Sequence, residues 1–237
     1  MVVELDVYIV QWLNQYAQKH PIFDALVVVI NRYSLTRGVV MVSLLWWAWM
    51  NSRKRLVTED LTLVKTVFGV LASIAVARGL QNMLPARLRP VHDPEVGFQL
   101  PWGFSGADAV LDWSSFPSDH AVLITALIFA VLQFNRLIGI LALVWGVCVI
   151  LLPRIYLGLH YPSDILAGAV VGVAIMATVQ RITVSPGVAQ GLARMEDQHR
   201  GLAYAAFFVF SYLCASMFND VRELLRLLAE LLELVSP

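Results

Sequence analysis

Hydrophobic residues occupy long runs of this chain, and polar residues gather between the runs. Six runs have the length or composition of helices that enter or cross a membrane, at residues 22–30, 39–50, 61–84, 121–134, 137–152 and 165–179. The first two are short for a hydrocarbon core that needs about 20 helical residues, so we expect tilting or extension by their flanks. No segment alternates with the period of a strand. The pattern predicts an all-α polytopic membrane helical bundle with a six-helix core over residues 20–182.

The two ends of the chain show a different pattern. Residues 1–19 have apolar positions at helical spacing, interrupted by acidic and amide side chains, which favours an amphipathic helix at the membrane surface. Residues 183–237 contain a polar linker, a seventh apolar run at 202–218 and a leucine-rich tail at 220–234. We expect an extra C-terminal span and a second amphipathic helix there. These elements either dock a partner or pack on the bundle.

Composition supports the membrane assignment. Of the 237 residues, 59% are hydrophobic and 14% are charged, whereas a soluble domain carries about 25% charged residues. A water-facing surface needs more polar cover than this chain supplies. The formal net charge is zero, which gives no reason to expect a nucleic-acid partner. Membrane lipids are therefore the expected surroundings of the chain.

Basic residues in the short loops predict an orientation. Residues 53–55, Arg136 and Arg181 fall on the same side of the predicted bundle, and the positive-inside rule assigns that side to the cytoplasm. The loops at residues 89–118 and 154–164 then lie on the outer side. We expect a bacterial inner-membrane protein whose chemical groups face the periplasm or the exterior.

Two clusters of polar residues at the edges of apolar runs suit attack on a phosphate. The first is Pro-Ser-Asp-His at residues 117–120, and the second contains Arg154, His160 and Asp164. Phosphoryl transfer needs cations around the phosphate, an in-line nucleophile and a proton for the leaving oxygen. Guanidinium groups match phosphate oxygens, so Arg89 and Arg154 are candidate clamps.

The histidines of the two clusters have distinct partners, which allows distinct roles. Asp164 can hold one imidazole nitrogen of His160 as N–H and leave the other nitrogen free as a nucleophile. His120 comes from a different helix and can protonate the leaving oxygen and later activate water. Ser118 can cap that helix, whose free N–H groups can face an anion.

These clusters resemble the motifs of the type 2 phosphatidic acid phosphatase family, within the superfamily that also contains the vanadium haloperoxidases. Residues 89–90 are similar to the first family motif, residues 117–120 to the second, and residues 154–164 to the third. The resemblance covers roughly residues 20–182. It implies a six-helix core, a site at the outer membrane face, and catalysis without a metal or other cofactor.

The same resemblance implies roles for individual residues. His160 would form a covalent phosphohistidine, Asp164 would orient it, and His120 would be the general acid. Residues implied or considered for binding the phosphate are Arg89, Ser118, Arg154, Asp119 and Arg78.

Three positions depart from the family pattern. Asn82 stands where the family has a lysine, and either Arg78 or Arg87 would supply the missing charge, with Arg78 preferred. Asp119 replaces a glycine and adds a negative charge near the predicted phosphate site, at a helix start that favours anions. Pro153 replaces a serine before the arginine of the third motif, which removes one hydroxyl contact.

The sequence therefore predicts an integral membrane phosphatase that hydrolyses a lipid phosphate or diphosphate through a phosphohistidine. The motifs do not choose among polyprenyl diphosphate, phosphatidate and phosphatidylglycerophosphate. Two alternatives stay open: a phosphotransferase that passes the phosphoryl group to another alcohol, and a non-catalytic protein that binds phosphorylated lipid. Haloperoxidase activity is disfavoured, because a membrane-embedded chain suits lipids better than halide chemistry.

Overall fold

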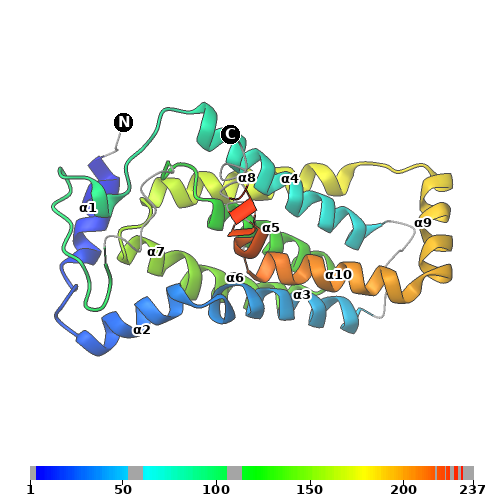
Figure 1. Cartoon of the computed structure of the whole chain (residues 1–237), viewed down its shortest axis with the longest axis horizontal. Helices are drawn as coiled ribbons and strands as arrows, with labels where there is room; N and C mark the ends of the chain where they lie inside the picture. The colour runs from blue at the N-terminus through cyan, green and yellow to red at the C-terminus, as the bar shows by residue number, and fades with distance from the viewer. Residues whose placement is uncertain are drawn as a thin grey trace.

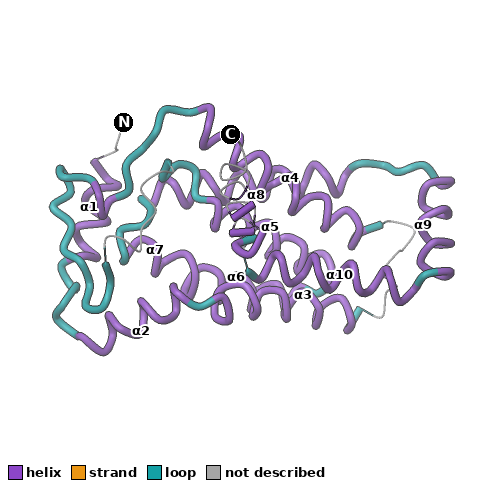
Figure 2. The backbone as a smooth tube through the Cα atoms, viewed as in Figure 1, coloured by secondary structure: helices purple, strands orange, loops and turns teal. Residues whose placement is uncertain are grey.

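The computed structural model describes most of the chain as an elongated bundle of helices (Figure 1). The described residues are 4–52, 61–105, 114–216, 218–221, 223–224, 227–228 and 231. Every regular element within them is a helix, as Figure 2 shows, which confirms the predicted all-α class. The basic residues 53–55 and much of the predicted tail at 220–234 lie outside the described residues.

Three described helical stretches are long and apolar enough to cross a membrane. They are α4 (Thr62–Met83), the stretch Arg136–Tyr156 and α8 (Pro162–Arg181). The middle stretch consists of α6 (Arg136–Trp145), the π-helical η4 (Gly146–Leu151) and α7 (Leu152–Tyr156). These stretches agree with the predicted runs at 61–84, 137–152 and 165–179.

The first two predicted spans form one bent pair. The π-helix η1 (Leu35–Val39) leads from α2 (Pro21–Arg32) into α3 (Val40–Asn51), and α2 makes an angle of 71° with the stretch Leu35–Asn51. With 12 residues, α2 is about 18 Å long, which is too short to cross a hydrocarbon core of about 30 Å alone. The pair is therefore a broken span or a re-entrant segment.

The helix α5 (Asp119–Phe134) is the centre of the bundle. Ser118 caps it, because the Ser118 hydroxyl accepts a hydrogen bond from the amide of Ala121 at 3.4 Å. The run that follows is apolar on all sides, as expected of a helix surrounded by other helices. Ten of its 16 residues are buried, and it packs against α3, α4, α6 and α8.

Two glycines bring the backbones of α5 and α8 into contact. A methyl group at Gly168 would lie 2.5 Å from the carbonyl oxygen of Ser118, and one at Gly172 would lie 2.4 Å from that of Val122. Small residues four positions apart allow such close approach between membrane helices. The contact sets the separation between the helix that begins at the second motif and the helix that begins at the third.

The seventh apolar run forms α10 (Arg200–Ala215), which packs along α3 (Figure 1). Trp46 and Trp49 of α3 lie against Phe207 of α10, with ring centroids 5.0 and 5.4 Å apart. Trp46 also donates a hydrogen bond of 2.9 Å from Nε1 to Ser211 Oγ. The seventh run therefore packs on the bundle, and docking of a partner on it stays a prediction.

The predicted polar linker before α10 contains a helix, α9 (Pro186–Gln198), and this corrects the sequence interpretation. Pro186 stands in its first turn, where a missing N–H costs nothing. Ala189, Leu192 and Ala193, spaced as on one helix face, pack against the core. The charged residues at its C-terminal end hide this short apolar stripe in the sequence.

The amphipathic helix α1 (Glu4–Asn14) turns its polar side toward the protein. Gln11 donates a hydrogen bond of 3.1 Å to the carbonyl of Val96. The Asn14 side chain exchanges two hydrogen bonds of 2.7 Å with the backbone of Gln99. The exposed large side chains of α1 are Leu5, Tyr8 and Trp12. α1 therefore holds the long loop that follows α4 and presents an apolar, aromatic side outward.

Candidate active site

The second and third predicted motifs meet at the end of the bundle that carries α1. His120 lies in the first turn of α5, His160 in the loop between α7 and α8, and Asp164 in the first turn of α8. Pro162 begins α8 and keeps the preceding residue extended, so the loop with His160 ends where the sequence predicts. All three polar side chains are buried.

The hydrogen bonds of His160 define which of its nitrogens is reactive. Nδ1 lies 2.9 Å from the carbonyl oxygen of Ser115, and a carbonyl can only accept, so Nδ1 carries the hydrogen. Nε2 is buried and has no hydrogen-bond partner among the described residues. A neutral imidazole protonated on Nδ1 has its lone pair on Nε2. This nitrogen is the candidate nucleophile.

The charges around His160 favour its neutral form. Burial lowers the pKa of His160, and the cations Arg154 and Arg89 lower it further, against the opposing effect of Asp164. Arg154 is itself buried and donates a hydrogen bond of 3.2 Å from Nη1 to Asn31. Arg89 donates from Nη1 to the carbonyl of Leu159 at 2.8 Å. Both arginines therefore bring positive charge to the candidate nucleophile.

Asp164 reaches His160 less directly than the sequence suggests. Its Oδ2 lies 3.8 Å from Nδ1 of His160, which is beyond hydrogen-bond distance. Ser115 lies between them: its hydroxyl donates to Oδ2 of Asp164 at 2.5 Å and lies 3.4 Å from Nδ1 of His160. Ser115 is thus a site residue that the motifs did not reveal. The only local signal for it is a polar residue just before the second motif.

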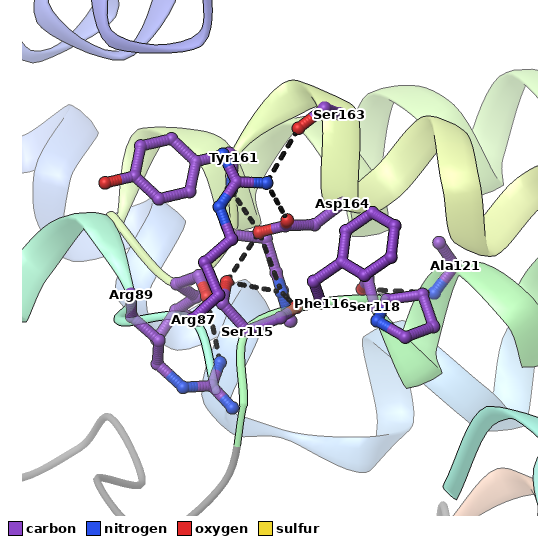
Figure 3. A network of polar contacts seen from close by, with 12 residues as sticks. Arg87, Arg89, Ser115, Phe116, Ser118, Ala121, Tyr161, Ser163 and Asp164 are labelled. Atoms are coloured by element: carbon purple, nitrogen blue, oxygen red, sulfur yellow. Dashed lines mark hydrogen bonds and ion pairs between the residues drawn. The ribbon is translucent and has the colours of Figure 1, made fainter. Parts of the chain in front are cut away.

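The guanidinium of Arg87 binds two carboxylates. Its Nη1 donates to Asp164 at 2.6 Å and to Ser163 at 2.8 Å, and Figure 3 shows the guanidinium pointing at both. Its Nη2 forms an ion pair of 2.7 Å with Asp6. The guanidinium also lies over the ring of Tyr161, with Cζ 4.2 Å from the ring centroid. Arg87 is one of the two candidates to replace the missing lysine. Its contacts show that it supports Asp164.

Arg78, the other candidate, is paired with Asp119. Arg78 Nη2 lies 2.8 Å from Asp119 Oδ2, and Arg78 Nη1 donates to Gln81 at 3.2 Å. The other carboxylate oxygen of Asp119 lies 3.0 Å from Nδ1 of His120 and accepts its hydrogen. Arg78, one turn before Asn82, and Asp119, at the glycine position, thus form one ion pair that orients His120.

Ser118 has structural contacts that connect the two motif helices. Its hydroxyl caps α5, and its amide donates a hydrogen bond of 3.1 Å to the carbonyl of Asp164. It is fully buried. A direct contact between Ser118 and a phosphate stays a prediction.

Arg37 is a second residue that the motifs did not reveal. It lies in η1, and its Nη1 donates a hydrogen bond of 3.2 Å to Nε2 of His120. In the sequence it lies in the short polar gap between the apolar runs 22–30 and 39–50, where a basic residue is no specific signal. The bend between α2 and α3 brings this cation to the start of α5.

A comparison with protein families decides the membership of the chain. The sequence profile of the PAP2 superfamily matches residues 62–185, which is just over half of the 237 residues. The chain belongs to the PAP2 superfamily. The resemblance drawn from the motifs is thereby confirmed, and both histidine motifs lie inside the matched segment.

Three curated relatives share parts of the sequence. The chain is 27% identical over 175 residues to the putative undecaprenyl-diphosphatase YbjG of Escherichia coli K12, covering 73% of this chain and 79% of that protein. It is 43% identical over 60 residues to the bacitracin transport permease protein BcrC of Bacillus licheniformis, covering 25% and 29%. It is 45% identical over 80 residues to the decaprenylphosphoryl-5-phosphoribose phosphatase of Mycobacterium tuberculosis, covering 34% and 41%. The match thus spans less than half of the last two.

A solved PAP2 structure shares the fold. It is the crystal structure of the first transmembrane PAP2 type phosphatidylglycerolphosphate phosphatase from Bacillus subtilis, with a TM-score of 0.51 and 16% identity. The match covers 74% of this chain and 83% of that one. Together with the apolar helices, this likeness identifies an integral membrane protein of the PAP2 fold.

Asp6 lies outside the matched PAP2 segment, yet it supports the start of α8. Its Oδ1 accepts a hydrogen bond of 2.9 Å from the amide of Ser163, and its Oδ2 accepts from the Ser163 hydroxyl and from Arg87. It is almost fully buried. Asp6 therefore caps α8 and holds Arg87 against Asp164.

We expect Asp6→Asn to destabilise this PAP2 protein. The change removes a buried charge that pairs with Arg87, and a hydrogen bond to a charged group contributes about 1.5–3 kcal/mol. The free energy of unfolding in detergent, measured by denaturant titration, should fall by about 2 kcal/mol. Glu4→Gln, at an exposed position of the same helix, is the control and should leave stability unchanged. Equal stability of both variants would contradict a supporting role for Asp6.

Proposed function

We propose that this protein is a membrane phosphatase that hydrolyses a lipid phosphate or diphosphate through a phosphohistidine at His160. The observation that carries the proposal is the buried Nε2 of His160, whose lone pair has no partner among the described residues while Nδ1 is held as N–H. A nucleophile with this geometry needs no deprotonation before attack. The cations Arg89 and Arg154, which act on its pKa, suit a phosphate bound next to it.

The first step transfers the phosphoryl group to the enzyme. Nε2 of His160 attacks the terminal phosphorus, an N–P bond forms, and the bond from phosphorus to the leaving oxygen breaks. His120 takes up a proton on Nε2 from water when the anionic substrate binds. The electron pair stays on the leaving oxygen, which then takes that proton from Nε2 of His120 acting as general acid. Asp119 favours the protonated imidazole, because its carboxylate accepts the hydrogen of Nδ1.

The second step returns the enzyme to its starting form. Water attacks the phosphorus of the phosphohistidine while His120 accepts a proton from it. The N–P bond breaks, inorganic phosphate leaves, and Nε2 of His160 regains its lone pair. Ser115 and Asp164 hold the ring in one orientation through both steps. Arginines supply the positive charge in this scheme, so we expect it to run without a metal ion.

The names of the relatives favour a polyprenyl substrate. Two of them are named for prenyl-linked substrates, an undecaprenyl diphosphate and a decaprenylphosphoryl phosphoribose. The solved structure is named for a phosphatidylglycerolphosphate, so that class belongs among the substrates to be compared. We therefore rank polyprenyl diphosphate first.

The membrane orientation that we propose places the site on the outer face of a bacterial inner membrane. Arg136 begins α6 and Arg181 ends α8, both at the end of the bundle opposite His160. The positive-inside rule assigns that opposite end to the cytoplasm. The site would then receive substrate from the outer leaflet.

Phosphate release in the presence of a chelator tests the proposal. We expect the protein, purified in detergent with EDTA and no added alcohol, to release phosphate from polyprenyl diphosphate faster than from phosphatidate or phosphatidylglycerophosphate. Activity that disappears on chelation and returns with Mg²⁺ would contradict the metal-free mechanism. Release that requires an added alcohol acceptor would favour a phosphotransferase. Binding of these lipids without turnover would favour a non-catalytic protein.

A further inference from the structure

Arg37 lies where the leaving group of the proposed reaction must pass. Nδ1 of His120 faces Asp119, so the proton for the leaving oxygen comes from Nε2. In the structure, Nε2 accepts a hydrogen bond from Arg37 Nη1 at 3.2 Å. The leaving group has to approach this same nitrogen. It therefore comes within reach of the guanidinium of Arg37.

Other contacts of Arg37 hold its guanidinium in this region. Its Nη2 donates to the carbonyl of Arg32 at 3.2 Å, and its charge is near enough to Arg154 for the two cations to repel each other. Repulsion between partly buried cations is relieved when an anion lies between them. Arg37 and Arg154 thus favour negative charge next to His120.

The two substrate classes differ in the charge of the leaving group. A lipid monophosphate releases a neutral alcohol when its phosphorus is attacked. A lipid diphosphate releases a lipid phosphate, because the bond that breaks joins the terminal phosphorus to the bridging oxygen and the electron pair stays on that oxygen. A guanidinium binds phosphate oxygens through paired charged hydrogen bonds, whereas it gains little from an alcohol.

We propose that Arg37 binds the lipid-linked phosphate of a diphosphate substrate and makes the site selective for diphosphates over monophosphates. The inference rests on the proposed function, and it names a residue outside the three family motifs and outside the matched segment. When the substrate binds, Arg37 exchanges Nε2 of His120 for phosphate oxygens. That exchange also frees the lone pair of Nε2 to take up the proton from water that it later gives to the leaving oxygen.

The test compares two substrates that share one lipid tail. Polyprenyl diphosphate and polyprenyl monophosphate are assayed with wild type, Arg37→Gln and Arg37→Lys. We expect Arg37→Gln to lower kcat/KM for the diphosphate by about 10- to 100-fold, the effect of losing a charged hydrogen bond. The value for the monophosphate should change by less than about threefold, and Arg37→Lys should recover part of the diphosphate activity because it keeps the charge.

Arg136→Gln is the matched control, because it removes an exposed arginine at the opposite end of the bundle. It should leave both substrates unaffected. A purely structural role for Arg37 would lower both activities of Arg37→Gln by the same factor. An equal loss on both substrates, or no loss on either, would overturn the proposal.

Binding of inorganic ions separates this inference from the proposed function. If the wild type turns over neither lipid, calorimetric titration with inorganic diphosphate and with inorganic phosphate still reports on Arg37. Weaker binding of diphosphate alone in Arg37→Gln supports the assignment. Equal affinities of wild type and variant for both ions refute it, whatever the outcome of the activity assay.

Discussion

Replacing His160 with alanine should abolish turnover while the protein stays folded. The change removes the only nitrogen that the mechanism uses as nucleophile, and loss of a covalent nucleophile costs on the order of a thousandfold or more in kcat. Its Nδ1 makes one short hydrogen bond to a backbone carbonyl, of 2.9 Å to Ser115, so the fold loses little by comparison. Phosphate release and the free energy of unfolding, measured on the same preparation, check both expectations.

A direct label sharpens this prediction. Polyprenyl diphosphate with a radioactive terminal phosphate should label the wild type. The bond between label and protein should survive base and break in acid, as in phosphohistidine. His160→Ala should not be labelled. His199→Ala, at an exposed position before α10, is the matched histidine control and should keep both activity and label. Full turnover by His160→Ala would remove His160 from the role of nucleophile.

Asp164→Asn should have the largest effect on stability. The ion pair between Asp164 and Arg87 is buried, with side chains 0% and 13% exposed. The same carboxylate accepts hydrogen bonds from Ser115 and from the amide of Tyr161. Removing one partner of a buried pair costs about 3–5 kcal/mol, and we expect the lower end of this range because Arg87 keeps its second ion pair with Asp6. Denaturant titration in detergent should show a loss of this size, together with a fall in kcat.

Two further variants test the cause of that loss. Glu95→Gln removes a carboxylate charge at an exposed loop position and should leave stability unchanged. Combining Asp164→Asn with Arg87→Met and Asp6→Asn removes all three charges of this cluster, and the triple variant should recover part of the lost stability. A loss below about 1 kcal/mol in the single variant would mean that the pair is worth no more than a surface ion pair.

The parts of the candidate site that could be predicted from the sequence are those encoded by short spacings. His160 and Asp164 are four residues apart, and Pro162 between them fixes where the helix begins. The apolar runs likewise predicted most helices, because periodicity is a local property. The helix α9 was missed because its apolar stripe is short and charged residues follow it.

The residues that were missed act across long sequence distances. Ser115 contacts His160 across 45 residues, Arg37 contacts His120 across 83, and Asp6 contacts Ser163 across 157. Such pairs depend on how helices pack, and a single sequence holds no pattern for them. The bend between α2 and α3, which brings Arg37 to the candidate site, was not predicted either. Each of the two helices has the sequence pattern of an ordinary apolar run.

The glycine contact between α5 and α8 restricts the path by which a lipid reaches the histidines. At Gly168 and Gly172 the gap between the two backbones does not admit even a methyl group, so a hydrocarbon tail cannot pass through that seam. The tail of a substrate must stay on another side of the bundle while its headgroup reaches His160. The bent pair of α2 and α3 borders the candidate site with the cation Arg37, so this side offers a charged contact to the headgroup.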